Sequence, residues 1–370
     1  MKITFVSLWA CKLFRQDEPQ PFGGAELQMY LLAKALARRH DVEVQFVTRG
    51  AGKFEIFDYQ GIRVYKLPFH ASHRARMLFG TIDLIRLCLR LDTGVFLQRA
   101  GGIETGIVAG CARLKKRKFV FMTSSLRDTD GTRQRLLGPL WGWIYSFGLR
   151  QSTTIVTQTT EQQEAMQRVH GLNSIALRSA HEIPEEIPPH KSGILWVGRC
   201  EKAKRPDILL QLAQDFPALL FTMVCPKANY PDLFTEIRER AASLPNLTFY
   251  ETLPFEQTEA LFARHQLYLN TSEHEGFPNT FVQAFKWGTP VISLFVDPDQ
   301  CLTRNNMGFC AQGDIHALKN EILKLSAPDS EKWKILQQNG RLYAQEQHDI
   351  NIIAEKFLKL IKSSLEQTGG

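Results

Sequence analysis

The sequence predicts an α/β protein built from two Rossmann-like, doubly wound domains. Short apolar runs typical of buried strands alternate with amphipathic helical segments, which indicates parallel sheets covered by helices. The length of 370 residues allows two domains of ordinary size. Residues 181–192 (HEIPEEIPPHKS) hold three prolines and several charges, a composition typical of an interdomain linker. We therefore assign residues 1–182 and a C-terminal helix in 349–370 to the first domain, and residues 183–348 to the second.

The first domain is expected to open with a strand, a glycine turn and a helix. We place a buried strand at Ile3–Leu8, a helix at Leu27–Arg38 and a second strand at Val42–Val47. The turn carries Gly23 and Gly24, where a backbone without side chains can approach a ligand beside free N–H groups. The spacing is not the GxGxxG fingerprint, so it gives little support to a dehydrogenase. A simple turn that begins a helix is the alternative.

Later strands of the first domain place polar residues at one edge of the sheet. The expected elements are a strand at Ile62–Tyr65, a helix near Met77–Leu91, a strand at Val95–Arg99, a helix at Gly102–Leu114 and strands at Lys118–Met122 and Ile155–Thr159. Ligands of doubly wound sheets bind beyond the carboxyl ends of the strands. This rule predicts that the Gly23 turn, Arg99 and residues 123–130 lie near one crevice, with Arg99 and Asp128 as candidate ligand contacts.

Residues 136–149 (LLGPLWGWIYSFGL) carry no charge and four aromatic side chains, with Arg133, Arg135 and Arg150 beside them. A helix that spans a bilayer needs about 20 residues, so this segment is too short to cross a membrane. Its length favours a helix buried in the core. The alternative is an interfacial patch with Trp141 and Trp143 at the depth of the lipid headgroups.

Charge is distributed unevenly along the chain. Residues 1–150 hold 24 Lys and Arg and 12 Asp and Glu, a net charge of +12, whereas the remaining residues hold 21 and 26, a net charge of −5. A basic half indicates contact with a negatively charged partner, either an anionic membrane surface or nucleic acid. No nucleic-acid recognition motif accompanies the charge, so we expect no nucleic acid. A solvated basic face is the third alternative.

The cysteines and the N-terminus favour the cytoplasm. The seven cysteines are odd in number and none forms a CxxC pair, which is typical of reduced thiols. Residues 8–11 resemble a lipoprotein cleavage box, but only Lys2 precedes them and the apolar run is short, so a buried strand fits better. We therefore expect a cytoplasmic protein, and the basic half makes the cytoplasmic face of the inner membrane a second expected location.

The second domain is expected to begin with a strand that leads into two cations. Ile194–Val197 predicts a buried strand, followed by Arg199 and Lys204. A helix then begins at Pro206, where a missing N–H costs no helical hydrogen bond. Two cations at a strand end beside a helix N-terminus can stabilise a leaving diphosphate. A solvated basic turn is the alternative.

Residues 267–294 (LYLNTSEHEGFPNTFVQAFKWGTPVISL) predict strand, loop, helix and strand. Asn279 or Thr280 is expected to cap the helix, and Gly288 to end it in a left-handed conformation. The loop and the helix N-terminus offer free backbone N–H groups to a phosphate. Glu275 on the loop and Gln283 on the helix can accept hydrogen bonds from sugar hydroxyls. The alternative is an ordinary αβ unit with a surface Glu and a helix Gln.

This stretch resembles the signature of family 4 of the glycosyltransferases, enzymes of the GT-B fold. The family pattern is Glu-Gly-Phe-Gly, about four residues, Glu-Ala, then Gly-x-Pro-Val-Ile. Residues 275–277, 284 and 288–292 match it, and Arg199 with Lys204 matches the family's Gly-Arg…Lys pattern.

Two positions depart from the family pattern. Pro278 stands where the family has Gly and removes one N–H, so the donor phosphate must use N–H groups of neighbouring residues. Gln283 stands where the family has the Glu that binds the ribose of the donor nucleotide, and its carbonyl oxygen can still accept a hydrogen bond.

The resemblance implies two Rossmann-like domains that face a central cleft, with a C-terminal helix that crosses back to the first domain. The first domain would bind the acceptor and the second a nucleotide-sugar. We assign catalytic roles to Arg199, Lys204 and Glu275, donor binding to Gly276, Phe277, Asn279, Thr280 and Gln283, and a loop that faces the donor phosphate and the acceptor to Gly23 and Gly24.

No metal or cofactor is assigned, and the nucleotide-sugar is a co-substrate. Residues 128–130 (DTD) match the DxD metal motif of the other main glycosyltransferase fold, but residues 297–299 (DPD) match it too, as chance predicts for such a short pattern. Residues 124–128 also lack the His that relatives often supply here to the active site.

The predicted function is retaining transfer of a sugar from a nucleotide-sugar to a glycan or lipid-linked acceptor in bacterial surface polysaccharide or lipopolysaccharide synthesis. The basic first domain would contact an anionic membrane peripherally. A sugar phosphorylase or sugar-nucleotide epimerase of the same fold is one alternative. A non-catalytic partner protein that kept the fold is another.

Overall fold

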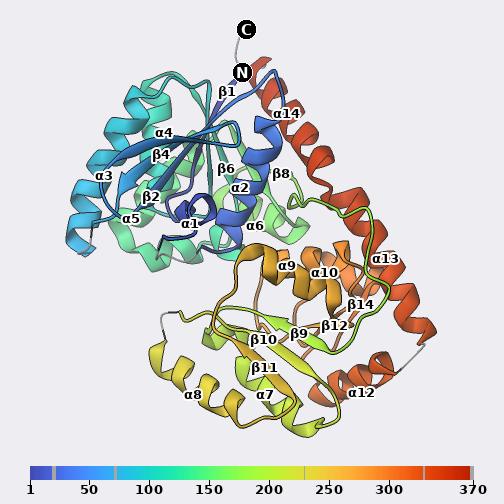
Figure 1. Cartoon of the computed structure of the whole chain (residues 1–370). Coiled ribbons are helices and arrows are strands. Elements are labelled where there is room, and N and C mark those ends of the chain that lie inside the picture. Colours follow the sequence, from blue (N-terminus) through green and yellow to red (C-terminus); the bar gives the residue numbers. More distant parts are fainter. Residues whose placement is uncertain (19–21, 71–72, 229, 328–329, 367–370) are drawn as a thin grey trace. The chain divides into compact units, whose positions relative to one another are not determined.

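The computed structural model describes residues 1–18, 22–70, 73–228, 230–327 and 330–366, so the last four residues of the expected C-terminal segment lie outside the described part. The chain forms two compact units (Figure 1). Unit 1 comprises Met1–Ala180 and Ile350–Gly370, and unit 2 comprises His181–Asp349. Residues 182–192, in the predicted linker, contain no helix or strand although all of them are described.

Unit 1 alternates strands and helices along the chain. Its elements are β1 (Lys2–Val6), α1 (Cys11–Phe14), α2 (Gly24–Ala37), β2 (Glu43–Gly50), β3 (Glu55–Tyr59), β4 (Ile62–Pro68), α3 (His73–Arg90), β5 (Val95–Arg99), α4 (Ile103–Leu114), β6 (Lys118–Met122), the 3-10 helix η1 (Leu126–Asp128), α5 (Thr132–Gln151), β7 (Thr154–Thr157), α6 (Thr160–His170), β8 (Ile175–Ala176) and α14 (Ile350–Glu366). The described strands form one sheet in the order β3-β4-β2-β1-β5-β6-β7-β8. Every neighbouring pair is parallel except β3–β4, which confirms the predicted doubly wound sheet.

The antiparallel edge of this sheet is a hairpin that the sequence analysis did not predict. Strands β3 and β4 pair with Tyr59 opposite Ile62, so only Gln60 and Gly61 form the loop. Both loop residues have positive φ angles, 48° and 82°, which are typical of the tight hairpin turns that match strand twist. The exposure of β3 alternates along the strand, as expected for an edge strand with only one partly buried face.

Helices cover the sheet of unit 1 and close its core. Helix α4 packs against both α3 and α5, and α2 packs with α14 (Figure 1). Lys362 on α14 also bonds Asp41 over 3.3 Å. Since α14 belongs to unit 1, the prediction that the C-terminal helix returns to the first domain is confirmed. No helix within the described ranges is both long and apolar enough to cross a membrane.

Unit 2 is a second parallel α/β unit. Its elements are β9 (Ile194–Val197), the 3-10 helix η2 (Lys202–Lys204), α7 (Pro206–Asp215), β10 (Phe221–Val224), α8 (Pro231–Ala242), β11 (Leu247–Tyr250), α9 (Phe255–Arg264), β12 (Leu267–Asn270), α10 (Asn279–Lys286), β13 (Val291–Ser293), the 3-10 helix η3 (Pro298–Gln300), α11 (Cys301–Arg304), β14 (Gly308–Cys310), α12 (Ile315–Ser326) and α13 (Glu331–His348). The described strands run in the order β11-β10-β9-β12-β13-β14, and all pairs are parallel.

Each sheet contains one point where the direction of strand addition reverses. In unit 1 the chain adds β2 and β4 on one side of β1 and then β5 to β8 on the other. In unit 2 it adds β10 and β11 on one side of β9 and then β12 to β14 on the other. Loops diverge at such points and leave a crevice at the carboxyl ends of the strands, where ligands of these folds bind. The β1–β5 and β9–β12 junctions are therefore where functional side chains should gather.

Candidate active site

Hydrogen bonds join the loops that follow β9 and β12. The Thr271 hydroxyl donates to the backbone oxygens of Lys204 and Arg205, over 2.7 and 3.0 Å. The Glu273 N–H donates to the Ala203 oxygen over 2.9 Å. These bonds hold the two loops, which are 67 residues apart along the chain at Thr271 and Lys204, in one arrangement at the switch point of unit 2.

Two of the three predicted catalytic side chains meet in this arrangement. Lys204 Nζ forms an ion pair with Glu275 Oε1, and the two side chains are 22% and 19% exposed. Arg199 lies on the same loop as Lys204 but pairs with Glu201 over 3.1 Å, and its side chain is 53% exposed. The structure thus brings Lys204 and Glu275 together, whereas Arg199 extends toward solvent from the neighbouring end of β9.

The N-terminus of α10 lies next to Glu275 in the sequence and differs from the prediction in its cap. The helix begins at Asn279, so Pro278 is the N-cap and the expected cap by Asn279 or Thr280 is wrong. Within the described residues, no side chain caps this helix end. An N-terminus without a side-chain cap offers backbone N–H groups and the positive end of the helix dipole to an anion. Gly288 follows the helix with a φ of 62°, which confirms the predicted left-handed ending.

Phe277, a predicted donor contact, lies with its side chain in the core. It is 4% exposed, and its ring centroid lies 5.1 Å from that of His348. Its ring belongs to the cluster formed by α10 residues such as Phe281 and Phe285. The benzyl group therefore packs the loop onto unit 2, and only backbone groups of Phe277 and the preceding Gly276 remain for a donor.

Gln283, the predicted ribose contact, belongs to a buried polar cluster. Its Nε2 donates to Glu259 Oε1 over 2.6 Å, and both residues are less than 9% exposed. Glu259 also accepts from Trp287 Nε1 over 3.1 Å and forms an ion pair with Lys286. This carboxylate on α9 therefore compensates a buried ammonium on α10. Glu259 was not predicted from the sequence, because its partners lie 24 to 28 residues further along the chain.

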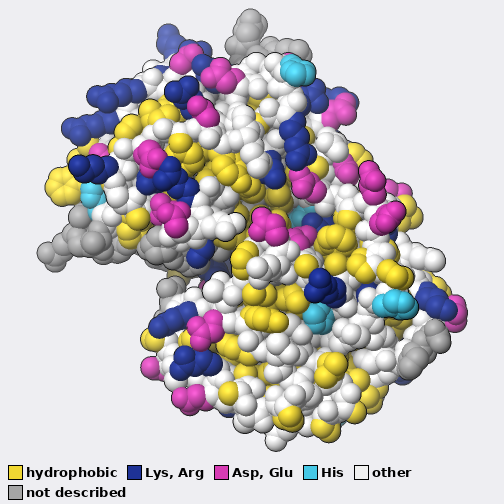
Figure 2. All heavy atoms as spheres, in the orientation of Figure 1, with side chains coloured by type: hydrophobic (Ala, Val, Ile, Leu, Met, Phe, Trp, Pro, Cys, Tyr) yellow, Lys and Arg dark blue, Asp and Glu magenta, His cyan; other side chains and the backbone are white. Residues whose placement is uncertain are grey.

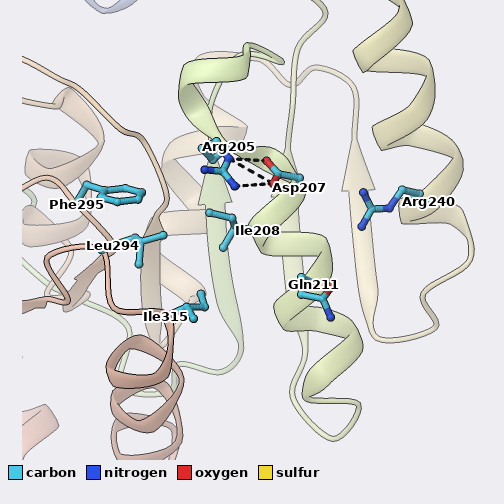
Figure 3. A pocket seen from close by; sticks show the side chains of 9 residues that line it. Arg205, Asp207, Ile208, Gln211, Arg240, Leu294, Phe295 and Ile315 are labelled. Carbon is cyan, nitrogen blue, oxygen red and sulfur yellow. Dashed lines mark hydrogen bonds and ion pairs between the residues drawn. The ribbon is translucent and has the colours of Figure 1, made fainter.

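A cavity of about 500 Å³ lies on the α7 side of unit 2 (Figure 3). Arg205 and Asp207 bond to each other at its rim, with Arg205 Nη2 donating to Asp207 Oδ2 over 3.0 Å. Leu294, Phe295 and Ile315 form an apolar side of the same cavity. Since Arg205 also pairs with Glu273 over 3.4 Å, this cavity adjoins the joined loops.

The switch point of unit 1 holds a smaller polar pocket of about 110 Å³. Arg99 at the end of β5 lines it together with Glu26, Glu104 and Trp9. Arg99 is 7% exposed, and burial lowers the pKa of its guanidinium to about 10, opposed by the nearby Asp128 and Glu26 carboxylates. Among the described residues, no acceptor lies within hydrogen-bond distance of Arg99 Nε. The pocket therefore combines a buried cation, two carboxylates and an indole ring that is 41% exposed.

The Gly23–Gly24 turn begins α2 beside this pocket. Gly23 is the N-cap, and its N–H donates to Glu26 Oε2 over 2.9 Å. The Gly23 φ of −118° is accessible to any residue, so its backbone conformation does not require glycine. A Cβ there would lie 3.0 Å from Glu26 Oε2 and crowd this bond. Glutamate three residues after the cap is the sequence signal that could have identified Glu26.

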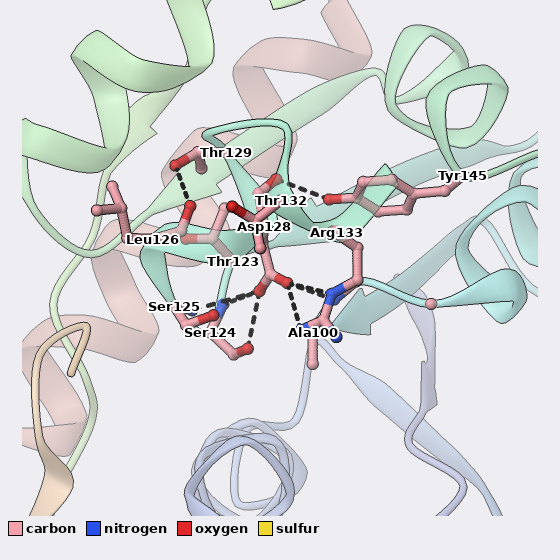
Figure 4. A network of polar contacts seen from close by, with 12 residues as sticks. Ala100, Thr123, Ser124, Ser125, Leu126, Asp128, Thr129, Thr132, Arg133 and Tyr145 are labelled. Atoms are coloured by element: carbon pink, nitrogen blue, oxygen red, sulfur yellow. Dashed lines mark hydrogen bonds and ion pairs between the residues drawn. The ribbon is translucent and has the colours of Figure 1, made fainter. Parts of the chain in front are cut away.

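Asp128 stabilises its own loop instead of facing a crevice (Figure 4). It is fully buried, and its carboxylate accepts from the backbone N–H groups of Gly101, Ser124 and Ser125, from the Ser124 hydroxyl and from Arg133, over 2.8 to 3.3 Å. These donors occupy both carboxylate oxygens. Asp128 is thus a structural residue of the loop after β6 and not an acceptor contact.

Two family models match the sequence, and their ranges do not overlap. Residues 23–178 match a glycosyl transferase 4-like domain, and residues 191–327 match glycosyl transferases group 1. A search of curated proteins finds no significant match.

Several solved structures share the fold at low sequence identity. Sucrose-phosphate synthase from Thermosynechococcus elongatus has a TM-score of 0.78 and 16% identity, over 100% of both chains. HepE from Anabaena, solved with UDP and with UDP-glucose, has a TM-score of 0.71 and 15% identity, over 98% of this chain and 100% of that chain. A variant of S. aureus TarM, solved with UDP and α-GlcNAc-glycerol, has a TM-score of 0.60 and 16% identity, over 75% of this chain and 58% of that chain.

The two family matches agree with the two parallel sheets, the returning C-terminal helix and the paired Lys204 and Glu275. The structural similarities independently support the fold. The chain belongs to the group 1, family 4-like glycosyltransferases, retaining enzymes of the GT-B fold that use nucleotide-sugar donors.

Proposed function

We propose that the protein transfers a hexosyl group, with retention, to a glycan or lipid-linked saccharide during synthesis of a bacterial surface polysaccharide or lipopolysaccharide, at the cytoplasmic face of the membrane. The observation that carries the proposal is the Lys204–Glu275 pair, held beside the N-terminus of α10 by the joined loops of unit 2.

Lys204, Arg199 and the α10 N-terminus would stabilise the leaving diphosphate. Negative charge builds on the diphosphate as its bond to the sugar carbon breaks, and fixed cations and N–H dipoles lower the barrier to that step without a metal. Arg199 is more exposed than Lys204, so it can turn from Glu201 to a phosphate at small cost.

Glu275 would orient the transferred sugar by accepting hydrogen bonds from its hydroxyls. We expect front-face attack, in which the donor phosphate accepts the proton of the acceptor hydroxyl. The ribose contact of Gln283 stays a prediction; since Nε2 already donates to Glu259, that contact would use Oε1 as an acceptor.

The pocket lined by Arg99 is our candidate for the acceptor. Its two carboxylates outnumber its one guanidinium, so the pocket favours hydroxyl groups over a second phosphate. The indole of Trp9 offers an apolar face to a sugar ring beside these polar groups.

The first experiment is a donor assay with UDP-, GDP- and ADP-hexoses, in which hydrolysis and transfer to candidate saccharides are measured separately. UDP-glucose comes first, because the similar HepE was solved with it. We expect one donor to raise thermal stability; a ligand at 100 times its Kd adds about 2.7 kcal/mol. Absence of binding and turnover with the whole panel would contradict the proposal.

A further inference from the structure

Helix α5 presents an uncharged apolar face to solvent. Leu136, Leu140 and Trp143, which we call the α5 patch, are 66%, 62% and 67% exposed. No residue from 136 to 149 is charged. The expectation of a fully buried core helix is therefore correct for only one face of this segment. Large exposed apolar groups gathered in one place mark an interaction surface.

Packing fixes which face of α5 points outward. On the inner face, a Cβ at Gly148 would lie 2.7 Å from the Gly106 nitrogen, and a Cβ at Gly106 would lie 2.2 Å from the Ile144 oxygen. These glycines let the backbones of α4 and α5 approach more closely than side chains would allow. Tyr145 and Leu149 fill the same inner side and are fully buried. Rolling α5 to bury Trp143 would break these contacts, so the patch cannot retract.

A local backbone feature places the patch at the surface. Gly138 has φ 78° and ψ 177°, so α5 consists of two helical pieces that meet before Pro139. Leu136 lies before this kink, while Leu140 and Trp143 follow it three residues apart, on one side of the second piece. Trp143 stacks on Phe147 at 6.1 Å, which orders its ring although it is exposed.

The net charge of unit 1 indicates an anionic partner. Unit 1 holds 29 Lys and Arg and 16 Asp and Glu, a net charge of +13, whereas unit 2 holds 16 and 22, a net charge of −6. Residues 103–151, which include α4 and α5, hold nine basic and three acidic residues, and one of the acids is the buried Asp128. Figure 2 shows Lys and Arg side chains gathered on the part of unit 1 where α3 and α4 lie.

We propose that the α5 patch enters the headgroup region of an anionic lipid membrane. Tryptophan favours this depth because its ring is apolar and its N–H is polar, and the net positive charge of unit 1 complements the lipid charge. Arg135 and Arg150 lie on α5 itself and are exposed. Neither the patch nor these arginines belongs to the candidate active site, so membrane binding is independent of whether the proposed reaction is correct.

Co-sedimentation with vesicles tests the proposal on the full chain. We expect binding to vesicles of phosphatidylcholine and phosphatidylglycerol in equal amounts, and little binding to phosphatidylcholine alone. The triple variant Leu136→Ser, Leu140→Ser, Trp143→Ser should bind vesicles at least tenfold less tightly, because it loses the inserted apolar groups. A tenfold change in affinity corresponds to about 1.4 kcal/mol of binding free energy. Arg135→Gln with Arg150→Gln should lower binding about fivefold per charge removed, and about 0.5 M salt should act in the same direction.

A matched control separates the patch from general surface hydrophobicity. Leu220, Leu323 and Ile335 in unit 2 are 63%, 50% and 46% exposed, and their triple Ser variant should bind vesicles as the wild type does. Brominated phosphatidylcholine mixed into the anionic vesicles should quench tryptophan fluorescence of the wild type, a readout that requires no variant. The proposal would be overturned if the patch variant and the control variant bound vesicles equally well. It would also be overturned if the patch variant lost self-association but still bound vesicles.

Discussion

Replacing Gln283 by the glutamate that the family carries should destabilise the protein at neutral pH. Gln283 Nε2 lies 2.6 Å from Glu259 Oε1 in a buried cluster. In Gln283→Glu two carboxylates would occupy this space. Like charges so close cannot both ionise, so one carboxyl must hold a proton that the unfolded chain releases.

The contact sets the magnitude. Repulsion between two unit charges about 4 Å apart is about 4 kcal/mol at an effective dielectric constant of about 20. Protonating a carboxyl with an ordinary pKa of about 4.3 costs about 4 kcal/mol at pH 7 and about 1 kcal/mol at pH 5. Because Lys286 pairs with Glu259 and compensates part of the charge, we expect a loss of about 2–4 kcal/mol at pH 7.

The pH dependence has a defined sign. The shared proton raises a carboxyl pKa in the folded variant above its unfolded value, so the proton contributes stability below about pH 4.3 that is lost as pH rises. In urea unfolding, the free energy of unfolding of the variant should therefore fall further below that of the wild type at pH 7 than at pH 5. Exchanging the residues, Glu259→Gln with Gln283→Glu, restores a single carboxylate and should recover most of the loss. Wild-type stability of Gln283→Glu at pH 7 would refute the reasoning.

Three other predictions follow from the described contacts. Lys204→Ala should lower kcat about 10²–10³-fold with the fold intact, and Arg199→Ala should lower it less because Arg199 is more exposed; unchanged initial rates with UDP-hexose in both variants would contradict their roles. Burial lowers the pKa of His265 below its ordinary value of 6.5, so folding stability is lost as pH falls through 6.5 toward the lower pKa of the folded state. In urea unfolding, His265→Asn should lose less stability than the wild type between neutral and acidic pH, and an equal loss in both proteins would contradict this prediction. Gly148→Ala should cost about 1–3 kcal/mol by overpacking α5 against Gly106 on α4, measured by urea unfolding, whereas a more stable variant would show that the helices can separate without cost.

Periodicity and turn chemistry predicted most of the architecture. The strand and helix pattern of unit 1 from β5 to β6 and that of unit 2 near β12 and α10 were confirmed, because each depends on local sequence. The unpredicted β3 is a short edge strand with its own hairpin partner, and its weak alternation gave little signal beside Gln60 and Gly61.

Partners distant in sequence were beyond that reasoning. Lys204 and Glu275 follow β9 and β12, which are adjacent strands of one sheet. Their proximity was predictable, because the carboxyl ends of parallel strands share an edge of the sheet. That reasoning could not show that Asp128 accepts from several donors of its loop, or that Gln283 donates to Glu259. It also favoured a core helix for residues 136–149 and could not show which face of α5 is buried, because the glycine contacts that fix its inner face join residues about 40 positions apart.

The path of the chain between the units has a practical consequence. Unit 2 is one uninterrupted stretch whose two ends adjoin, since the His181 N–H donates to the His348 oxygen over 2.8 Å and His181 pairs with Asp349. It can therefore be excised as a single gene fragment without cutting a helix or strand. Unit 1 cannot be made by truncation after Ala180, because α14 would be lost from its place against α2.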